Sequence, residues 1–485
     1  MYMAVKSNVH FCCFYSVAFF VSLLFVVVLF FSCFVSVFSG GVFPFVLGAS
    51  DRVVSTEREL RNAVNNAVGS TVIALDKDIT LTDSALNISA NKDISLTSTS
   101  ATKFYKLIGT NEQSTIIVVE TDGSLLLDGI IVTHRDDDNR ATGVLVNSGG
   151  ALILSDGEIS GNHKYGVWNQ GNFRLLGGKI SENTHYVGKN GPAGGGGVYN
   201  QGIFDMLGGE ISDNRLEPSY ISGFGSGGVY NEGVFNMSGG IISKNNAPFG
   251  AGVSNQGYFT MSGGEISGNF EGEGVRNGGS FSMSGGKISD NLESSGVFNG
   301  RNGANFSLSG GEISGNGVSP PYLVMGGGVC NEGVFMMSGG TISNNKAMDG
   351  GGIYNGGGSR DATFSMSGGV ISGNIAEVVE DLLGNGGGVF NDYDCTFSLS
   401  ENGVISNNTA EVGGGLYNAG TFNKRAGVIS GNTATQYNNI YPTDDSDNIN
   451  DESLTGYVVL IVSIVVLVSV IVGGLFFYFK RAQKL

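Results

Sequence analysis

The chain has 485 residues, including 80 glycines and 7 prolines, with a formal net charge of −17 and an isoelectric point of about 4.6. Glycine is this frequent without a strict Gly-X-Y triplet repeat, which excludes collagen and favours a β structure rich in turns. The acidic charge excludes a nucleic-acid partner, because phosphate binding requires a basic surface. A surface of this charge suits a secreted or cell-surface protein.

Residues 1–49 are predicted to form a secretory signal. Lys6 precedes a long apolar run, and the small residues Gly48, Ala49 and Ser50 follow it. This order of a basic residue, an apolar stretch and small residues is typical of a signal peptide. The run is long for a cleaved signal, so an uncleaved signal-anchor is the alternative interpretation.

Residues 50–140 are predicted to hold an N-terminal cap and irregular first coils. The segment 56–68 has helical spacing, with Leu60, Ala63 and Val64 on one face. Thr56 and Glu59 stand three residues apart, as in a capping box. A short helix over the end of a β-stack covers apolar core and unpaired strand edges, so we expect a capping helix here.

Residues 141–440 repeat one phrase, and a clean copy at 228–245 reads Gly-Val-Tyr-Asn-Glu-Gly-Val-Phe-Asn-Met-Ser-Gly-Gly-Ile-Ile-Ser-Lys-Asn. A short period with a fixed apolar pattern indicates a solenoid, in which each unit packs against its neighbours. We align eleven turns on the Asn of the Val-Tyr-Asn phrase, at Asn147, Asn169, Asn200, Asn231, Asn255, Asn277, Asn299, Asn331, Asn355, Asn391 and Asn418.

Several apolar columns run through these turns. One is the aliphatic residue two positions before each aligned Asn, beginning at Leu145 and Val167. The others are a Phe, a Met or Leu two residues later, and the Ile of Ile-Ser-x-Asn. Residues two apart on a strand point the same way, so each turn is predicted to have three short strands that face a common core. A turn of this length has no room for a helix, which favours an all-β parallel β-helix with coils about 4.8 Å apart.

The turns between the strands are rich in Gly, Ser and Asn. The Ser-Gly-Gly before each Ile is predicted to provide a positive φ at a corner. The repeated Asn side chains are predicted to hydrogen-bond to one another in a ladder, in preference to a ligand role. Cys330 and Cys395 lie about two turns apart, which is too far for a disulfide, so we interpret them as isolated residues.

The C-terminal part is predicted to anchor the protein. Residues 441–456 form an acidic juxtamembrane linker, and residues 457–479 are an uncharged apolar stretch long enough to cross a bilayer as a helix. The tail, residues 480–485, carries Lys480, Arg481 and Lys484. Because such cations remain cytoplasmic, the expected arrangement is a single-pass protein with the solenoid outside the cell.

These phrases resemble the right-handed parallel β-helix repeats of pectin-lyase-like proteins, and most closely the repetitive adhesin-like surface proteins of microbes. The Gly-Gly-Gly-Val-Tyr-Asn and Ile-Ser-Gly-Asn phrases are also similar to repeats of polymorphic outer-membrane proteins. The resemblance covers roughly residues 55–440 and implies a right-handed solenoid. It is specific for fold and much less so for function, because one fold hosts many activities.

Enzymes that resemble this fold cut acidic polysaccharides with clustered carboxylates. The strongest catalytic candidate is the run His134 to Asp138, with Arg135 and three Asp residues, although consecutive residues splay apart and a solvated loop is the favoured interpretation. His163 and His185 lack a third ligand for zinc. We therefore expect no catalytic residue, metal or cofactor, and keep a polysaccharide lyase or glycoside hydrolase as the alternative.

A second candidate is what we call the outer column, the residue between each column aliphatic and its Asn. It is predicted to point away from the core and to bind glycans by stacking sugars on its rings. The alternative is that the rings only cover Gly-rich neighbours and pack under long loops. The predicted ligand-binding residues are Trp168, Tyr199, Tyr230, Phe298, Tyr354, Phe390 and Tyr417, and the other positions are Val146, Ser254, Arg276 and Cys330.

The insertions place most sequence variety on one side of the rod. They fall between the Asn of Ile-Ser-x-Asn and the next Gly-Val, for example at 184–196 and 215–227. Repeat proteins use such a side for binding. The prediction is an adhesin or surface-interaction module for glycans or other cell surfaces. A passive coat protein is a further alternative.

Overall fold

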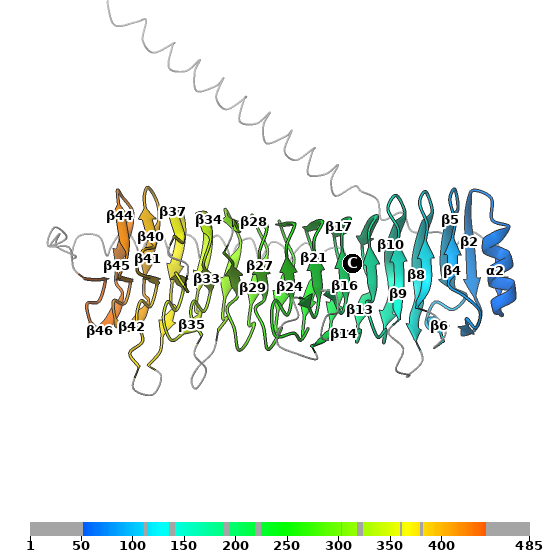
Figure 1. The fold of residues 1–485 in the computed structure, drawn as a ribbon, viewed down its shortest axis with the longest axis horizontal. Helices are drawn as coiled ribbons and strands as arrows, with labels where there is room; N and C mark the ends of the chain where they lie inside the picture. Colours follow the sequence, from blue (N-terminus) through cyan, green and yellow to red (C-terminus); the bar gives the residue numbers. More distant parts are fainter. Residues whose placement is uncertain are drawn as a thin grey trace, which may run out of the picture. The chain divides into compact units, whose positions relative to one another are not determined.

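The computed structural model describes residues 52–110, 114–134, 141–187, 194–218, 225–301, 303–317, 324–358, 361–378 and 382–442. Over these residues the chain is β apart from one short helix, and it winds into a parallel solenoid of about 13 turns (Figure 1). Neighbouring turns pair in parallel, with equivalent residues opposite each other. The predicted all-β parallel solenoid is therefore confirmed.

One strand of each turn comes from the Val-x-Asn segment. These strands and their counterparts in the first and last turns form a 14-stranded sheet, and from β11 to β43 an aliphatic residue lies opposite an aliphatic residue and Asn opposite Asn. The strands are β4 (Leu86–Ile88), β7 (Thr115–Val119), β9 (Thr142–Val146), β11 (Val167–Asn169), β16 (Val198–Asn200), β21 (Val229–Asn231), β24 (Val253–Asn255), β27 (Val275–Asn277), β30 (Val297–Asn299), β33 (Val329–Asn331), β36 (Ile353–Asn355), β39 (Val389–Asn391), β43 (Leu416–Asn418) and β47 (Ile440–Tyr441).

The Phe and Ile segments provide the other two strands of each turn. The Phe strands are β12 (Asn172–Leu175), β17 (Ile203–Met206), β22 (Val234–Met237), β25 (Tyr258–Met261), β28 (Ser280–Met283), β31 (Asn305–Leu308), β40 (Thr396–Leu399) and β44 (Thr421–Lys424). The Ile strands are β13 (Lys179–Ser181), β18 (Glu210–Ser212), β23 (Ile241–Ser243), β26 (Glu265–Ser267), β29 (Lys287–Ser289), β32 (Glu312–Ser314), β41 (Val404–Ser406) and β45 (Val428–Ser430). Three long strands continue through both positions: β10 (Ala151–Ser160), β34 (Val334–Ser343) and β37 (Thr363–Ser372).

The first turns belong to the same sheets as the repeats. Their other strands are β1 (Arg52–Val54), β2 (Ser70–Leu75), β3 (Ile79–Thr80), β5 (Asp93–Ser98), β6 (Tyr105–Gly109) and β8 (Ser124–His134). Strand β8 pairs with β10 and β7 pairs with β9, so the sheets continue from these turns into the repeats.

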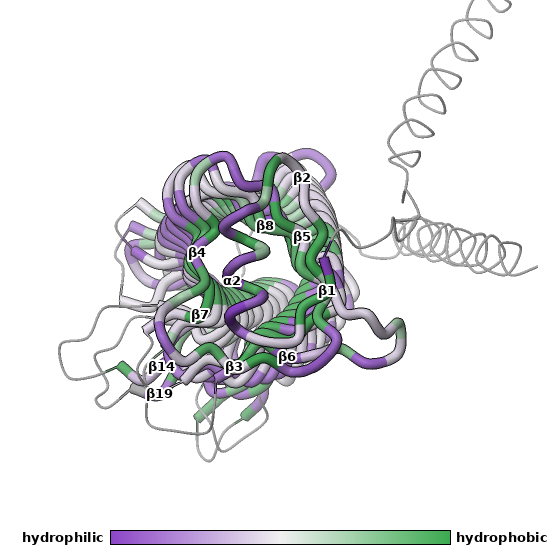
Figure 2. The backbone as a smooth tube through the Cα atoms, turned by 90° about the vertical axis from the view of Figure 1, so that its right-hand side faces the viewer, coloured by the Kyte–Doolittle hydropathy of each residue, from purple (hydrophilic) through white to green (hydrophobic). Residues whose placement is uncertain are grey.

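Helix α2 (Glu57–Asn65) lies at the end of the stack beside β2 (Figures 1 and 2). The Thr56 hydroxyl accepts a hydrogen bond from the Glu59 amide, and the Glu59 carboxylate accepts one from the Thr56 amide. Leu60, Ala63 and Val64 are buried in the cluster that runs through the solenoid. The expected helix and its capping box are thus present, with the expected face turned to the core.

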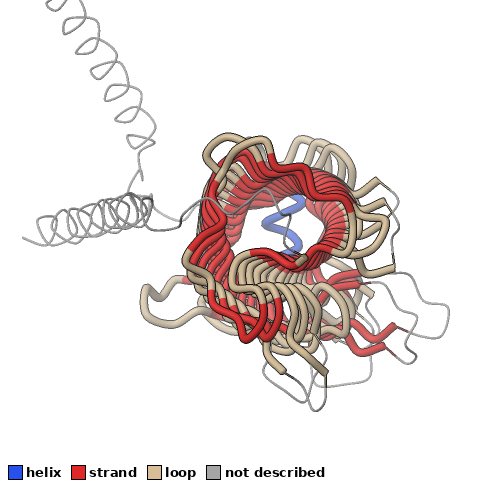
Figure 3. The backbone as a smooth tube through the Cα atoms, turned by 90° about the vertical axis from the view of Figure 1, so that its left-hand side faces the viewer, coloured by secondary structure: helices blue, strands red, loops and turns tan. Residues whose placement is uncertain are grey.

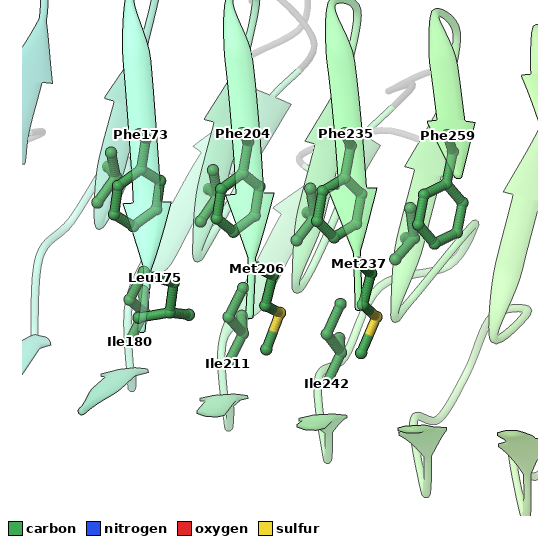
Figure 4. Close-up of a cluster of buried hydrophobic side chains, with 14 of the residues drawn as sticks. Phe173, Leu175, Ile180, Phe204, Met206, Ile211, Phe235, Met237, Ile242 and Phe259 are labelled. Atoms are coloured by element: carbon green, nitrogen blue, oxygen red, sulfur yellow. The ribbon is translucent and has the colours of Figure 1, made fainter. Parts of the chain in front are cut away.

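Stacked side chains fill the interior of the solenoid. From Phe173 to Phe422 the Phe rings of successive turns lie 4.6–5.0 Å apart, with interplanar angles of 5–22°. Figure 4 shows four of them, from Phe173 to Phe259. Leu175, Met206 and Met237 follow the Phe on the same side, and the Ile column faces them. All are buried, as the period-2 pattern predicts.

The second glycine of each Ser-Gly-Gly occupies a corner that no other residue fits well. Gly240 has φ +83°, a conformation that L side chains rarely adopt. A Cβ there would stand 2.5 Å from Cε of Met206 and 2.7 Å from the carbonyl oxygen of Gly208 in the preceding turn. The predicted positive φ is confirmed, and the close approach of the Met side chain gives a second reason for glycine.

Two ladders of buried Asn side chains run along the solenoid. In the first, each Nδ2 donates to Oδ1 of the next turn, as from Asn169 to Asn200 at 2.7 Å. The second uses the Asn of Ile-Ser-x-Asn, as from Asn183 to Asn214 at 2.9 Å. Both also donate to backbone carbonyls, which satisfies amides that would be costly to bury unpaired. The predicted structural ladder is confirmed.

Short strands lie outside this ring on the side where the insertions occur (Figures 2 and 3). Strands β14 and β19 pair with each other, as do β15 and β20. The strands on this side are β14 (Thr184–Val187), β15 (Gly194–Gly195), β19 (Arg215–Pro218), β20 (Gly225–Ser226), β35 (Lys346–Ala347), β38 (Ile375–Ala376), β42 (Thr409–Val412) and β46 (Thr433–Gln436).

The alignment of the first repeat was wrong by one residue. Val144 pairs with Val167, and Leu145 pairs with Trp168, so Val146 takes the place of the column Asn. Val144 and Val146 are buried and Leu145 is half-buried, so burial of two valines sets this register. Asn147 instead donates to the Glu120 carboxylate at 2.7 Å.

The predicted signal (1–49), most of the linker (441–456), the apolar stretch (457–479) and the tail (480–485) lie outside the described residues, so they stay predictions. In the described part of the chain, no helix has the length and apolarity to cross a bilayer. Cys330 and Cys395 are both buried and are not joined in a disulfide, as the spacing predicted.

Candidate functional site

The outer column lies outside the solenoid core, as predicted, and gathers into two clusters. Tyr199 and Tyr230 pack with Tyr165 and Trp168 in the first. The second contains Phe298, Cys330, Tyr354, Phe390 and Tyr417. Tyr199, Tyr230, Tyr354 and Phe390 are more than nine-tenths buried, whereas Trp168, Phe298 and Tyr417 remain partly exposed.

In the first cluster, the Tyr165 ring lies directly beneath a strand of the insertion side. A Cβ on Gly194 of β15 would stand 2.4 Å from Cε1 of Tyr165, and one on Gly195 would stand 2.8 Å from the Tyr230 amide nitrogen. Glycine lets this backbone lie directly over the first cluster. For the buried rings, the alternative of packing beneath long loops therefore describes the structure better than an open stacking surface.

Both clusters are stacked, but the first is less regular. Tyr354, Phe390 and Tyr417 lie 4.8 Å apart with interplanar angles of 3–5°. Trp168 and Tyr199 stack at 5.8 Å with an angle of 12°, and Tyr199 is tilted by 51° against Tyr230. In the first cluster the polar tips of the rings, and not ring stacking alone, set the geometry.

Three polar-tipped rings each donate a hydrogen bond to the residue after the column Asn in the following turn. Trp168 Nε1 donates to Gln201 Oε1 at 3.0 Å, and the Tyr199 hydroxyl donates to Glu232 Oε2 at 2.8 Å. The Tyr354 hydroxyl donates to Asp392 Oδ2 at 2.9 Å. Tyr and Trp need such partners when buried. We call these acceptors, together with Gln170, the corner residues.

The corner residues of the first cluster form a connected network. Gln201 Nε2 donates to the Tyr199 hydroxyl at 2.8 Å and to Glu232 Oε2 at 3.0 Å, and Gln170 donates to Gln201 Oε1 at 3.2 Å. Gln170, Gln201 and Glu232 are nevertheless exposed to solvent. Two amides and one carboxylate are therefore fixed in position at a surface, next to the partly exposed Trp168.

Burial and the nearby carboxylate shift the ionisation of these rings. Desolvation, aided by the charge of Glu232, raises the pKa of Tyr165 to about 12. Desolvation, together with the hydrogen bond to Glu232 and its charge, raises the pKa of Tyr199 and of Tyr230. Desolvation lowers the pKa of Lys164, whose Nζ lies 5.1 and 5.2 Å from the Tyr165 and Trp168 ring centroids. At neutral pH the tyrosines are thus neutral hydrogen-bond donors.

Of the predicted catalytic and metal candidates, the structure describes three histidines. His134 is buried, and its Nδ1 donates to Asn162 Oδ1 at 2.9 Å, which places it at the start of the second Asn ladder. Residues 135–140, which include the three Asp, lie outside the described residues. His185 stacks on Tyr165 and His163 lies near Tyr186. No group of three potential metal ligands occurs among the described residues.

Sequence reasoning missed the corner residues. They follow the column Asn directly, but Gln, Glu, Gly, Asp and Ala all occur at this position, so no fixed pattern marks it. The sequence signal that could have indicated them involves two adjacent turns. It is a Trp or Tyr in the outer column of one turn, with an amide or carboxylate side chain directly after the column Asn of the next turn.

Comparison of the chain with protein-family models, with curated proteins and with solved structures finds no match in any of the three.

Proposed function

We propose that this chain is a right-handed, pectin-lyase-like surface protein that binds neutral glycans without cleaving them. In this proposal the apolar segment 457–479 anchors it in a membrane and the solenoid projects from the cell. The binding surface consists of Trp168 with Gln170, Gln201 and Glu232. One observation carries the proposal: a partly exposed indole lies beside exposed amides and a carboxylate that are already held in position.

This combination suits a sugar. Sites for small ligands combine an apolar surface with a few fixed polar groups that set orientation. The exposed part of the indole supplies apolar surface, and the amide and carboxylate groups can form hydrogen bonds with sugar hydroxyls. Because the corner residues are already tied together, little side-chain entropy is lost on binding. The net charge of −17 and the Glu232 carboxylate favour neutral over acidic glycans.

The residues of the outer column have different roles in the proposed glycan binding. Tyr199 and Tyr230 hold Gln201 and Glu232 from below and do not contact the sugar. Phe298 and Tyr417 also keep part of their surface exposed, but the Arg276 guanidinium lies over the Phe298 ring, and Tyr417 stacks with Phe390 and Tyr441. The first cluster is therefore the proposed site.

Trp168 allows a direct test, because it is the only tryptophan of the chain. Neutral polysaccharides and cell-wall fractions are added to the full chain, purified in mild detergent, while tryptophan emission is recorded. We expect a saturable emission change, and retention on an array of the same glycans that Trp168→Ala reduces on the order of tenfold. Tyr417→Ala, which removes a partly exposed ring from the second cluster, should leave retention unchanged.

Three results contradict the proposal. Equal retention of the Trp168→Ala variant and the unaltered chain rejects this surface as a glycan site. New reducing ends or unsaturated sugars in the product mixture support the alternative of a polysaccharide lyase or hydrolase instead. Absence of retention on every fraction favours a passive coat.

A further inference from the structure

A second surface lies on the insertion side, where two successive turns are short. The chain runs from Asn269 to Gly274 and from Asn291 to Gly296, whereas the equivalent segments 214–228 and 316–328 are much longer. Phe270 and Leu292 begin the short segments and lie next to each other in adjacent turns. They are 42% and 55% exposed, so two large apolar side chains form one uncovered patch.

A glutamate follows each of these apolar residues in an unusual backbone conformation. Glu271 has φ +70° and Glu293 has φ +73°. Left-handed backbone is costly for a residue with a Cβ, and Glu is not among the types that tolerate it best. The conformation also occurs at other turns of the solenoid, for example at Glu182 and Glu401, so it is a cost of these turns and does not by itself mark a site. We call Phe270, Glu271, Leu292 and Glu293 the short-turn patch.

The two glutamates also bring like charges together. Because Phe270 and Leu292 pair across adjacent turns, Glu271 and Glu293 occupy equivalent places in those turns, and both are exposed. Like charges on neighbouring strands are destabilising. The same two positions thus combine backbone strain with charge repulsion, and neither term stabilises the solenoid.

The cations near the patch do not neutralise it. The Arg276 guanidinium lies over the Phe249 and Phe298 rings, at 4.9 and 4.2 Å from their centroids, and its Nη1 pairs with Glu273 Oε1 at 2.7 Å. Glu273 is buried and also accepts from the Gly250 amide at 2.8 Å. Residues 265–296 contain five carboxylates and two cations, so the patch remains acidic.

We propose that the short-turn patch binds a cationic amphipathic polypeptide segment. Leu or similar side chains of the segment cover Phe270 and Leu292, and Lys or Arg side chains pair with Glu271 and Glu293. The occupant is chosen by complementarity: apolar side chains alone would leave the glutamates unpaired, and charge alone would leave the apolar surface in water. This surface is separate from the proposed glycan site and does not depend on it.

The test uses the full chain in phosphatidylcholine nanodiscs, with empty nanodiscs as the blank. The probe is a fluorescent synthetic peptide of alternating lysine and leucine, and its counterpart has serine in place of leucine. We expect saturable binding of the lysine–leucine peptide that weakens as salt is added. Glu271→Gln/Glu293→Gln and Phe270→Ser/Leu292→Ser should each weaken it on the order of tenfold.

A matched control removes the same charge elsewhere. Glu265 and Glu312 flank Lys287 on the Ile strands, so Glu265→Gln/Glu312→Gln changes net charge equally outside the patch and should leave binding unchanged.

A further variant separates folding from binding. Glu271→Gly/Glu293→Gly relieves the backbone strain, so it should raise the melting temperature while it weakens binding.

Several results overturn the proposal. These are equal binding by the patch variants and the unaltered chain, an equal loss in the Glu265→Gln/Glu312→Gln control, or equal binding of the lysine–serine peptide. The last two results indicate non-specific attraction to an acidic protein. A change in sedimentation of the Phe270→Ser/Leu292→Ser variant to a smaller species shows that a second copy of the chain occupies the patch instead.

Discussion

The Phe column inside the solenoid and the outer column outside it repeat once per turn, yet they differ in uniformity. From Phe173 to Phe422 the inner column contains only Phe, with ring spacings of 4.6–5.0 Å. The outer column admits Ser254, Arg276 and Cys330 among its rings. The inner rings have the same neighbours in every turn, whereas the outer ones meet a different segment each time.

This difference separates what holds the solenoid together from what distinguishes one turn from another. A closed interior accepts one shape, because voids and overpacking are both costly. Outside, Trp168 has an exposed amide network, Arg276 stacks between two Phe rings and Cys330 is a buried thiol whose pKa burial raises to about 12. Turn-specific chemistry is thus confined to the outer surface.

The largest expected effect comes from removing an inner ring. Phe281 is buried between Phe259 and Phe306, and Phe281→Ala leaves a cavity in a continuous stack. We expect a loss of about 3–5 kcal/mol in the free energy of unfolding. Because solenoid turns interact only with their neighbours, amide hydrogen exchange should rise most in the adjacent turns.

The matched substitution in the outer column is Phe298→Ala. Phe298 is only partly buried, so its truncation removes less buried apolar surface than that of Phe281. It should therefore shift the denaturant midpoint much less. Similar midpoints for Phe281→Ala and Phe298→Ala would show that the inner and outer columns contribute equally to stability.

A second, smaller effect is expected at the glycine corner. Gly240→Ala adds a Cβ close to Met206 and to a carbonyl oxygen and also places Ala at φ +83°, whereas Gly268→Ala meets no atom within 4 Å at φ +62°. The conformational cost is about 1–2 kcal/mol at each site. Gly240→Ala should therefore lower the thermal midpoint more than Gly268→Ala, and equal midpoints would show that the Met206 side chain moves aside without cost.

Most of the solenoid could be predicted because its pattern is periodic. The aliphatic, Phe, Met and Ile columns each repeat at a fixed spacing, and burial follows from period 2 alone. The alignment of the first repeat was wrong because Val144, Leu145 and Val146 are all aliphatic. Only their pairing with the strand that contains Val167 and Trp168 shows which two face inward. Three successive aliphatic residues do not show by themselves which of them face the core.

The candidate surfaces were harder to predict, since they depend on contacts between turns. In the first cluster, Gly194 of β15 lies against the Tyr165 ring, and no local pattern encodes such a contact between turns. The short-turn patch is likewise visible in sequence only as a missing insertion. Its strain appears only as backbone angles at Glu271 and Glu293.

The smallest expected effect concerns the first ring cluster at high pH. An unfolded tyrosine loses its proton near pH 10, whereas burial and Glu232 raise the pKa of Tyr165 to about 12 in the folded chain. Between these values the native state holds a proton that the unfolded state has released, so stability falls as pH rises from about 10 to about 12. Combined replacement of Tyr165, Tyr199 and Tyr230 by Phe should flatten this part of the thermal midpoint–pH curve. Tyr258→Phe, at a ring that is 67% exposed, should leave the curve unchanged. An unaltered slope in the triple variant would show that other groups cause the loss of stability at high pH. In that case the three tyrosines stabilise the turns by ring packing, and the protonation of their hydroxyls does not contribute.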